Sequence, residues 1–191
     1  NSEVMMVLGD NIFYGQNFSG ILSSALDDHE HSTIFTYPVN NPSQFGILDF
    51  DNNNYPLEAI EKPKKSKSNS AITGLYIFDE NVSVLAEEVK PSGRGELEIT
   101  DVINIYLKNN ETKIVNLGRG FAWLDTGTHD SLIKAGHFVE TVENKQGYKI
   151  ACLEEIALNN KWINSNQISN AIDRLIHTSY GDYLKNLIEK E

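Results

Sequence analysis

Two aspartates stand directly after short apolar runs, where a strand of an α/β sheet would end. Asp10 follows residues 4–8 in "VMMVLGDN", and Asp125 closes the run "GFAWLDTG". Ligands of open α/β sheets gather at the carboxyl ends of the strands. Two carboxylates that converge there suit Mg²⁺, which takes one or two protein carboxylates and fills its other positions with phosphate and water. Either aspartate could instead cap the turn that follows it, so the spacing leaves both interpretations open.

Three further charged residues stand at the end of a strand or in a loop. Glu61 and Lys62 end "AIEKP"; a carboxylate can accept hydrogen bonds from sugar hydroxyls, and a lysine is a compact charge for a phosphate. Arg94 lies between two glycines in "SGRGE", on a flexible loop that could carry its guanidinium onto a phosphate. Gly74, inside "ITGLY", indicates a bulge or a closely approaching ligand. Taken singly, the charged residues are also typical of a solvated edge or a surface turn.

The composition narrows the class of protein. A formal charge of −11 over 191 residues argues against a nucleic-acid surface but leaves a nucleotide substrate open. The single cysteine, Cys152, excludes an internal disulfide and fits a reducing compartment. No apolar run reaches the roughly 20 residues that span a membrane, and no signal peptide is evident. The five histidines lack zinc-ligand spacing. We therefore expect a cytoplasmic protein without a membrane or nucleic-acid partner.

Hydrophobic periodicity predicts an α/β fold with a mixed sheet flanked by helices. The apolar run 4–8 is typical of a buried strand, and with the helix at 18–26 and the strand at 32–39 it forms a βαβ unit. Later elements are expected as a hairpin (45–50 and 56–63), strands (71–79, 112–118 and 120–125) and helices (82–89, 97–108 and 132–142). Short helical segments follow residue 148. We place a boundary near Gly147, between an α/β part, 1–147, and a small C-terminal helical subdomain, 148–191.

Six blocks in a fixed order carry a resemblance to a known family. "LGDNIFYG", "FGILDFD", "EKP", "TGLYIFD", "GRGELEITD" and "WLDTGTHDSL" resemble the sugar nucleotidylyltransferases. The blocks "GELEITD" and "WLDTGTH" are similar, more narrowly, to the bacterial glucose-1-phosphate thymidylyltransferases. The likeness covers residues 4 to 187 and implies a Rossmann-like nucleotidyltransferase fold.

The resemblance implies a reaction and a set of site residues. The phosphate of glucose 1-phosphate would attack dTTP and give dTDP-glucose and pyrophosphate, on the path to dTDP-rhamnose and surface polysaccharides. Asp10 and Asp125 would hold Mg²⁺, and Arg94 would be catalytic, gripping the sugar phosphate together with Lys62. The remaining substrate-binding positions that the resemblance implies are Gly46, Glu61, Gly74, Tyr76 and Trp123.

The chain also departs from that family. Relatives begin with a strand and a glycine-rich GGxGTRL loop, which here would require about a hundred residues before Asn1. The chain is therefore expected to be the C-terminal two-thirds of the enzyme, with the N-terminal part missing, and to be inactive alone.

Gly15, Arg119 and Glu155 match positions that the family uses for a second nucleotide site. Ser19 and Asn159, however, stand where many relatives have His and Arg. The family forms homotetramers, and part 148–191 is similar to the segment that packs between subunits.

Two other functions stay open from the sequence. The chain could be a non-catalytic module that binds sugar phosphate and serves in assembly. It could also belong to a uridylyl- or cytidylyltransferase of the same family, because the residues that choose the base lie outside this sequence.

Overall fold

A six-stranded mixed sheet organises the first of the two units of the chain. In the computed structural model, which describes residues 2–189, the units span Asn1–Leu132 and Ile133–Glu191. Across the sheet the order is β5 (Pro56–Glu61), β4 (Gly46–Phe50), β6 (Ser70–Phe78), β3 (Ser32–Pro38) and β7 (Thr112–Asn116), with β1 (Val4–Val7) also pairing with β6. Of the pairs among described strands, only β3 with β7 is parallel. The predicted mixed α/β sheet is confirmed.

Strand β6 is the centre of this sheet, and all nine of its residues are buried. It pairs with β1, β3 and β4. Ile34 of β3 lies opposite Tyr76, whereas Thr36 lies opposite Ile72, so β6 carries extra residues between these two pairs. Gly74 is one of them and has a φ of +70°, a backbone conformation that favours glycine. The predicted bulge at Gly74 is confirmed.

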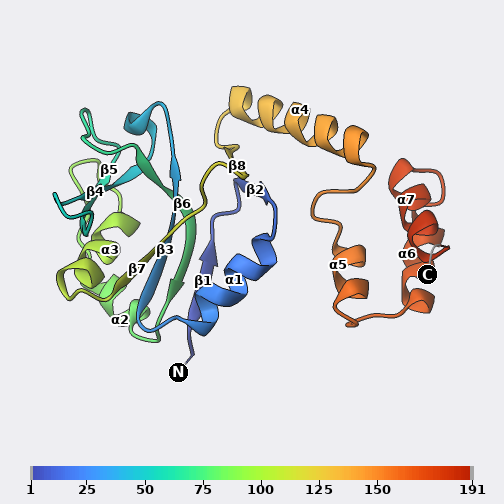
Figure 1. The fold of residues 1–191 in the computed structure, drawn as a ribbon, viewed down its shortest axis with the longest axis horizontal. Coiled ribbons are helices and arrows are strands. Elements are labelled where there is room, and N and C mark those ends of the chain that lie inside the picture. The colour runs from blue at the N-terminus through green and yellow to red at the C-terminus, as the bar shows by residue number, and fades with distance from the viewer. Residues whose placement is uncertain (1, 190–191) are drawn as a thin grey trace. The chain divides into compact units, whose positions relative to one another are not determined.

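Helices cover both faces of the sheet (Figure 1). On one face, α2 (Val82–Glu87) and α3 (Ile99–Lys108) pack on a core that includes Phe78 and Tyr106. On the other face, α1 (Phe18–Asp27) packs on a second core around Phe35. A short 3₁₀ helix, η1 (Pro42–Gln44), precedes β4. Both cores arise from period-two alternation along β3 and β6 meeting the apolar stripes of the helices.

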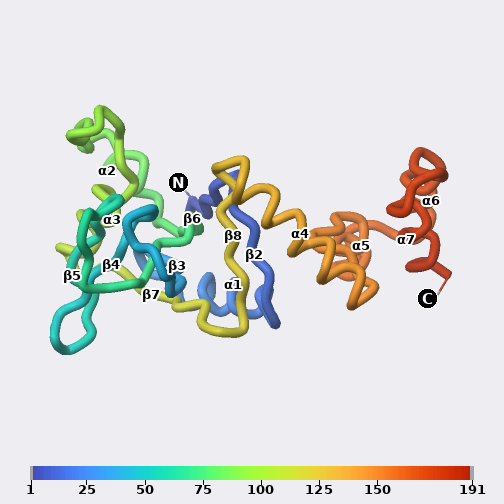
Figure 2. Tube along the Cα trace, turned by 90° about the horizontal axis from the view of Figure 1, so that it is seen from above, coloured from blue at the N-terminus to red at the C-terminus, as the bar shows by residue number. Residues whose placement is uncertain are grey.

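A two-stranded ribbon lies apart from the main sheet, and its first strand was not predicted. Asn11–Gly15 forms a strand, β2, which pairs antiparallel with β8 (Phe121–Asp125); Figure 2 shows the two side by side. The strand β2 was not predicted, because it has only three apolar residues in a row. A glycine and two polar residues precede them, and another glycine follows. Asp125 therefore ends a ribbon strand rather than a strand of the main sheet.

The burial predicted for the first strand is also wrong. Val4, Met5 and Val7 are 41%, 42% and 52% exposed. In the described residues β1 pairs only with β6, so its other edge is open. A continuous apolar run indicates burial only where neighbouring elements cover both faces and edges of the strand.

The second unit is helical, as predicted for the C-terminal part. It contains most of α4 (His129–Gln146), together with α5 (Leu153–Asn159), α6 (Ser165–Arg174) and α7 (Ser179–Ile188). Cys152, Ile168 and Leu184 form its core. The units divide near the start of α4, whereas the sequence analysis places the boundary after that helix; the roles assigned to 1–147 and 148–191 stay predictions.

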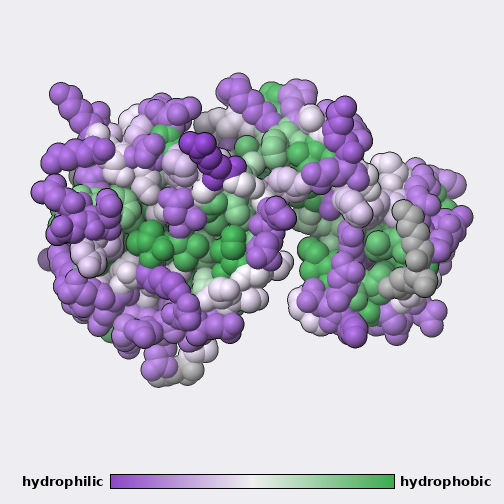
Figure 3. Space-filling model, viewed as in Figure 1, coloured by the Kyte–Doolittle hydropathy of each residue, from purple (hydrophilic) through white to green (hydrophobic). Residues whose placement is uncertain are grey.

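Figure 3 shows the surface character of one face of each unit. Hydrophilic residues cover much of that face, and hydrophobic residues form patches within each unit. Within residues 2–189, no helix combines the length and the apolar character needed to cross a bilayer.

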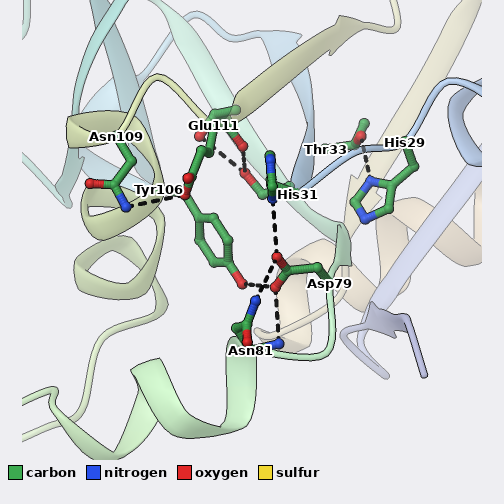
Figure 4. A network of polar contacts seen from close by, with 10 residues as sticks. His29, His31, Thr33, Asp79, Asn81, Tyr106, Asn109 and Glu111 are labelled. Atoms are coloured by element: carbon green, nitrogen blue, oxygen red, sulfur yellow. Dashed lines mark hydrogen bonds and ion pairs between the residues drawn. The ribbon is translucent and has the colours of Figure 1, made fainter. Parts of the chain in front are cut away.

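A polar network closes the end of β6 (Figure 4). The Tyr106 hydroxyl donates to Asp79 Oδ1 at 2.7 Å, and Asn81 donates to the same carboxylate through its amide side chain at 3.1 Å and its backbone N–H at 3.0 Å. His31 Nδ1 lies 3.3 Å from Asp79 Oδ2. Burial acts to raise the pKa of Asp79, but the hydrogen bonds, from Tyr106 first, outweigh it and lower that pKa below its usual value.

The network yields a prediction about stability and pH. Tyr106→Phe removes a hydrogen bond to a charged group and is expected to lower the free energy of unfolding by about 1.5–3 kcal/mol at pH 7. A carboxyl whose pKa is depressed in the folded state stabilises above its unfolded pKa, 3.8 here, and loses that contribution as the pH falls through its folded pKa. The stability lost through Tyr106→Phe should therefore become smaller below about pH 4. Urea denaturation of both proteins at several pH values would measure this difference.

The matched control is Tyr55→Phe, which removes the hydroxyl of an exposed tyrosine. We expect it to leave stability unchanged. A Tyr106→Phe loss that stays the same at acid pH would contradict the charge-assisted bond.

Candidate functional site

A cavity of about 370 Å³ opens beside the main sheet in the first unit. Its walls come from the β1–β2 turn, from β4, β5 and β6, from the start of α3 and from the end of β8. They comprise Leu8, Asp10, Asn11, Gln44, Phe45, Gly46, Glu61, Lys62, Ile72, Gly74, Tyr76, Leu97, Glu98, Ile99, Thr100, Trp123 and Asp125. The cavity brings together eight of the nine residues predicted for the metal and substrate sites. The ninth, Arg94, does not line the cavity but forms an ion pair with Glu61, which does.

The pairing of β2 with β8 brings the two predicted metal ligands together. Asn11 at the start of β2 lies opposite Asp125 at the end of β8, so Asp10 stands beside Asp125. The Thr126 backbone N–H and hydroxyl both donate to the Asp10 carbonyl oxygen, at 2.8 and 2.9 Å. The chain on either side of the two carboxylates is thereby tied together.

Gly127 leaves a space that both carboxylates face. A Cβ at this position would lie 3.1 Å from Asp125 Oδ1 and 3.3 Å from Asp10 Oδ2, and the Gly127 N–H donates to Asp125 Oδ1 at 3.0 Å. The two oxygens are thus within contact distance of one point that carries no side chain. Within residues 2–189 no group of three His, Cys, Asp or Glu side chains converges to hold a metal. Both carboxylates also line the cavity, and such a pair is a donor set that Mg²⁺ accepts when phosphates complete it.

On another wall, cations surround Glu61. The Arg94 Nη1 atom lies 3.3 Å from Glu61 Oε1, and the Lys62 Nζ atom lies 3.8 Å from the same oxygen. Arg94 also contacts Glu96 at 2.6 Å and Glu98 at 3.7 Å. Two positive groups therefore adjoin the cavity in a protein of formal charge −11. Both are paired with glutamates, so an anionic ligand would have to exchange with these carboxylates for the cations.

The wall between the carboxylate pair and Glu61 is apolar and aromatic. Tyr76 is buried, and burial, with the neighbouring Glu61 charge, raises the pKa of its phenol, so the hydroxyl stays protonated at neutral pH. The rings of Phe45 and Trp123 lie with their centroids 5.0 Å apart. At Gly46 a Cβ would come within 3.1 Å of Thr100 and 3.2 Å of Glu61 Oε2. The backbone at Gly46 thus lies directly against the Glu61 carboxylate.

Several residues of the cavity were not among the predicted site residues. Asn11 donates to Asp10 Oδ1 at 2.9 Å, and Glu98 accepts from Ser92 at 2.8 Å while facing the cavity. Both stand in the blocks "LGDN" and "GELEITD", so their adjacency to candidate residues was a usable signal. Phe45 carried the same signal, because it begins the block "FGILDFD" and directly precedes the candidate Gly46.

Residues matched to a second nucleotide site fall in different units. Gly15 ends β2 opposite Phe121, against whose ring any side chain at Gly15 would collide. Arg119 is exposed in the loop before β8. Glu155 belongs to the second unit, where it accepts a hydrogen bond from the Tyr183 hydroxyl at 2.5 Å. A second nucleotide site made of these residues stays a prediction.

The family model described as nucleotidyl transferase matches residues 1–142, which include every residue of the cavity. The chain belongs to the nucleotidyl transferase family. Membership agrees with a site that places paired carboxylates and cations around one open cavity.

Named nucleotidyl transferases resemble the chain over its whole length. It is 46% identical over 190 residues to the glucose-1-phosphate thymidylyltransferase of Neisseria meningitidis serogroup A, covering 100% of this chain and 66% of that protein. The enzyme of the same name from Mycolicibacterium smegmatis is 43% identical over 194 residues, again covering 100% and 66%. The chain thus spans just under two-thirds of the length of these relatives.

Solved structures of nucleotidyl transferases share the fold. A Bacillus anthracis structure described as a glucose-1-phosphate thymidylyltransferase superposes with a TM-score of 0.63 at 36% identity, covering 72% of this chain and 55% of that one. A UDP-glucose pyrophosphorylase gives 0.62 at 19% identity, covering 75% and 56%; this likeness shows the fold alone. The expected Rossmann-like nucleotidyltransferase fold is confirmed.

Gly74 offers a test of how tightly this nucleotidyl transferase cavity is built. An alanine there would face strain from the φ of +70° and place its Cβ 2.7 Å from Leu8 Cδ1 and 3.3 Å from Asn11 Nδ2. Gly74→Ala is expected to lower the free energy of unfolding by about 2–4 kcal/mol, which urea denaturation would measure.

The control is Gly118→Ala. Gly118 has a similar φ of +65°, but the nearest atom to its added Cβ is Asn116 Oδ1 at 4.0 Å. In this variant, backbone strain alone should lower the free energy of unfolding by about 1–2 kcal/mol. Equal losses of stability in the two variants would show that the cavity wall rearranges to accommodate the added methyl group without further cost.

Proposed function

We propose that the protein transfers dTMP from dTTP to glucose 1-phosphate, releasing pyrophosphate and forming dTDP-glucose. The observation that carries the proposal is the cavity, in which the Asp10–Asp125 pair, Glu61 and Lys62 line one space and Arg94 adjoins it through its ion pair with Glu61. The 46% identity to the Neisseria meningitidis glucose-1-phosphate thymidylyltransferase covers every residue of that cavity. It supports this substrate pair over those of other nucleotidyl transferases.

The sugar phosphate would occupy the side of the cavity formed by β4, β5 and β6. Glu61 can accept hydrogen bonds from sugar hydroxyls, and the backbone at Gly46 adjoins its carboxylate. Lys62 and Arg94 would bind the phosphate; Arg94 would then exchange its contact with Glu61 for the substrate anion. Tyr76 and Trp123 would enclose the sugar ring and exclude water.

Asp10 and Asp125 would hold Mg²⁺. The fit rests on the space at Gly127 that both carboxylates face. The ion, when bound, would neutralise phosphate charge and hold the nucleotide in line with the attacking sugar phosphate.

The chain's own residues contribute positioning and charge rather than covalent chemistry. Two anions must approach each other in the reaction, so Lys62 and Arg94 offset their repulsion. Glu61 and the apolar wall fix the sugar, which sets the direction from which its phosphate meets the nucleotide. No nucleophilic side chain is needed, because the sugar phosphate itself is the nucleophile.

The product suggests a wider setting. We propose that dTDP-glucose made here supplies the path to dTDP-rhamnose, and that the protein acts as a homo-oligomer.

The reaction is tested by pyrophosphate release from dTTP and glucose 1-phosphate in the full-length protein. Asp10→Asn and Asp125→Asn are each expected to lower turnover by about a thousandfold, since each removes a charge from the proposed metal site. Asp28→Asn, at an exposed residue paired with Lys113 at 3.0 Å, should leave turnover unchanged. Binding of glucose 1-phosphate without any turnover would instead favour a non-catalytic sugar-phosphate module, and preference for UTP or CTP another member of the family.

The space at Gly127 gives a further prediction. Gly127→Ala places a methyl group between the two carboxylates and is expected to weaken binding of Mn²⁺, used in place of Mg²⁺, on the order of tenfold. Gly120→Ala is the control, because nothing lies within 4 Å of its added Cβ. Electron paramagnetic resonance of free Mn²⁺ measures both affinities. Unchanged affinity in Gly127→Ala would place the cation elsewhere.

A further inference from the structure

We propose that Trp123 and Asn11 form a hydrogen-bonded relay that orients the Asp10 carboxylate, which makes Trp123 a positioning residue for the metal site. This inference rests on the proposed role of Asp10 as a metal ligand. It assigns Trp123 a task beyond lining the sugar pocket.

Two hydrogen bonds connect the three side chains. Trp123 Nε1 donates to Asn11 Oδ1 at 2.6 Å, and Asn11 Nδ2 donates to Asp10 Oδ1 at 2.9 Å. Asn11 and Trp123 are diagonal neighbours across the ribbon, because Asn11 lies opposite Asp125 and Trp123 is two residues earlier on the same face of β8. The register of β2 with β8 therefore sets the relay as well as the carboxylate pair.

The chemistry of the three groups gives the relay a single direction. An indole N–H can only donate, so the amide oxygen of Asn11 must face Trp123. The amide nitrogen then faces Asp10, and an ionised carboxylate can only accept. With an acceptor or an apolar group in place of the indole, the Asn11 amide would no longer be fixed in this orientation.

The relay leaves the two oxygens of Asp10 with different tasks. Oδ1 is held by Asn11, whereas Oδ2 faces the space at Gly127 that Asp125 also faces. Asp10 itself is exposed, so without this bond its short side chain would be free to rotate. Hydrogen bonds that orient a metal-binding carboxylate in this way raise the affinity of the site.

The surroundings hold both members of the relay in place. The Trp123 ring packs against Phe45 and Tyr37, with centroids 5.0 and 6.1 Å away. A Cβ at Gly74 would lie 3.3 Å from Asn11 Nδ2, so the glycine in the bulge of β6 leaves room for the amide. The relay thus joins the ribbon to the centre of the main sheet.

The test uses Mn²⁺ affinity in the full-length protein. Trp123→Phe keeps a ring and removes the donor, and Asn11→Leu keeps the shape and removes both polar groups. Each is expected to weaken Mn²⁺ binding about tenfold. Because Trp123 would act only through Asn11, the double variant should bind no more weakly than Asn11→Leu alone.

Tyr37→Phe is the matched control. It also removes one hydrogen-bond donor beside the same indole, but its hydroxyl bonds to the Phe121 carbonyl at 2.9 Å and not to the relay. It should leave Mn²⁺ affinity unchanged. The relay would be overturned if Trp123→Phe bound Mn²⁺ as tightly as Tyr37→Phe does. It would also be overturned if the two losses of Mn²⁺ affinity added in the double variant.

A second measurement separates failure of the relay from failure of the metal site. The Trp123 indole donates to Asn11, so Asn11→Leu should shift the Trp123 indole N–H signal in a ¹⁵N spectrum without metal, the signal being assigned by its absence in Trp123→Phe. An unmoved signal would overturn the relay. A shifted signal together with full Mn²⁺ binding by Asp10→Asn would overturn the proposed metal site, and with it the positioning role.

Discussion

The antiparallel pairing of β2 with β8 is the constraint on which the site depends. These strands are more than a hundred residues apart in the sequence, yet their register sets Asn11 opposite Asp125. It thereby places two carboxylates around the space at Gly127 and brings the Trp123 indole to the Asn11 amide. A shift of one residue would turn alternate side chains to the opposite face and separate these groups. The ribbon is short, so the hydrogen bonds from Thr126 to Asp10 help to fix its end.

The main sheet supplies another wall of the cavity. Strand β6 is buried along its whole length, and its bulge at Gly74 lets Leu8 and Asn11 approach closely. Glu61 at the end of β5 gathers Lys62 and Arg94 beside an otherwise apolar and aromatic wall. Carboxylates also line this cavity, so the two cations are already partnered and a bound anion would compete with glutamates for them.

Most of the element order was predictable, because long amphipathic helices and alternating strands carry strong periodicity. The helix at 97–108, which is α3 (Ile99–Lys108) in the structure, the hairpin of β4 and β5 and the bulge at Gly74 were all predicted. The strand β2 and the exposure of β1 were not, since both depend on which elements pair with these segments. In the site, Asp10, Glu61 and Trp123 could be named from motifs, whereas the contribution of Asn11 required the geometry of its two neighbours.

The sequence by itself determined the types of group available: carboxylates after apolar runs, an arginine between glycines, and an ordered set of blocks that the nucleotidyl transferase family shares. Only the tertiary structure decided which of these groups meet. Asp10 and Asp125 converge through a ribbon rather than along one sheet edge, and the indole N–H fixes an amide that in turn fixes a carboxylate. Local periodicity fixes a residue's own conformation, but contacts across a hundred residues depend on strand register, which the whole packed core decides.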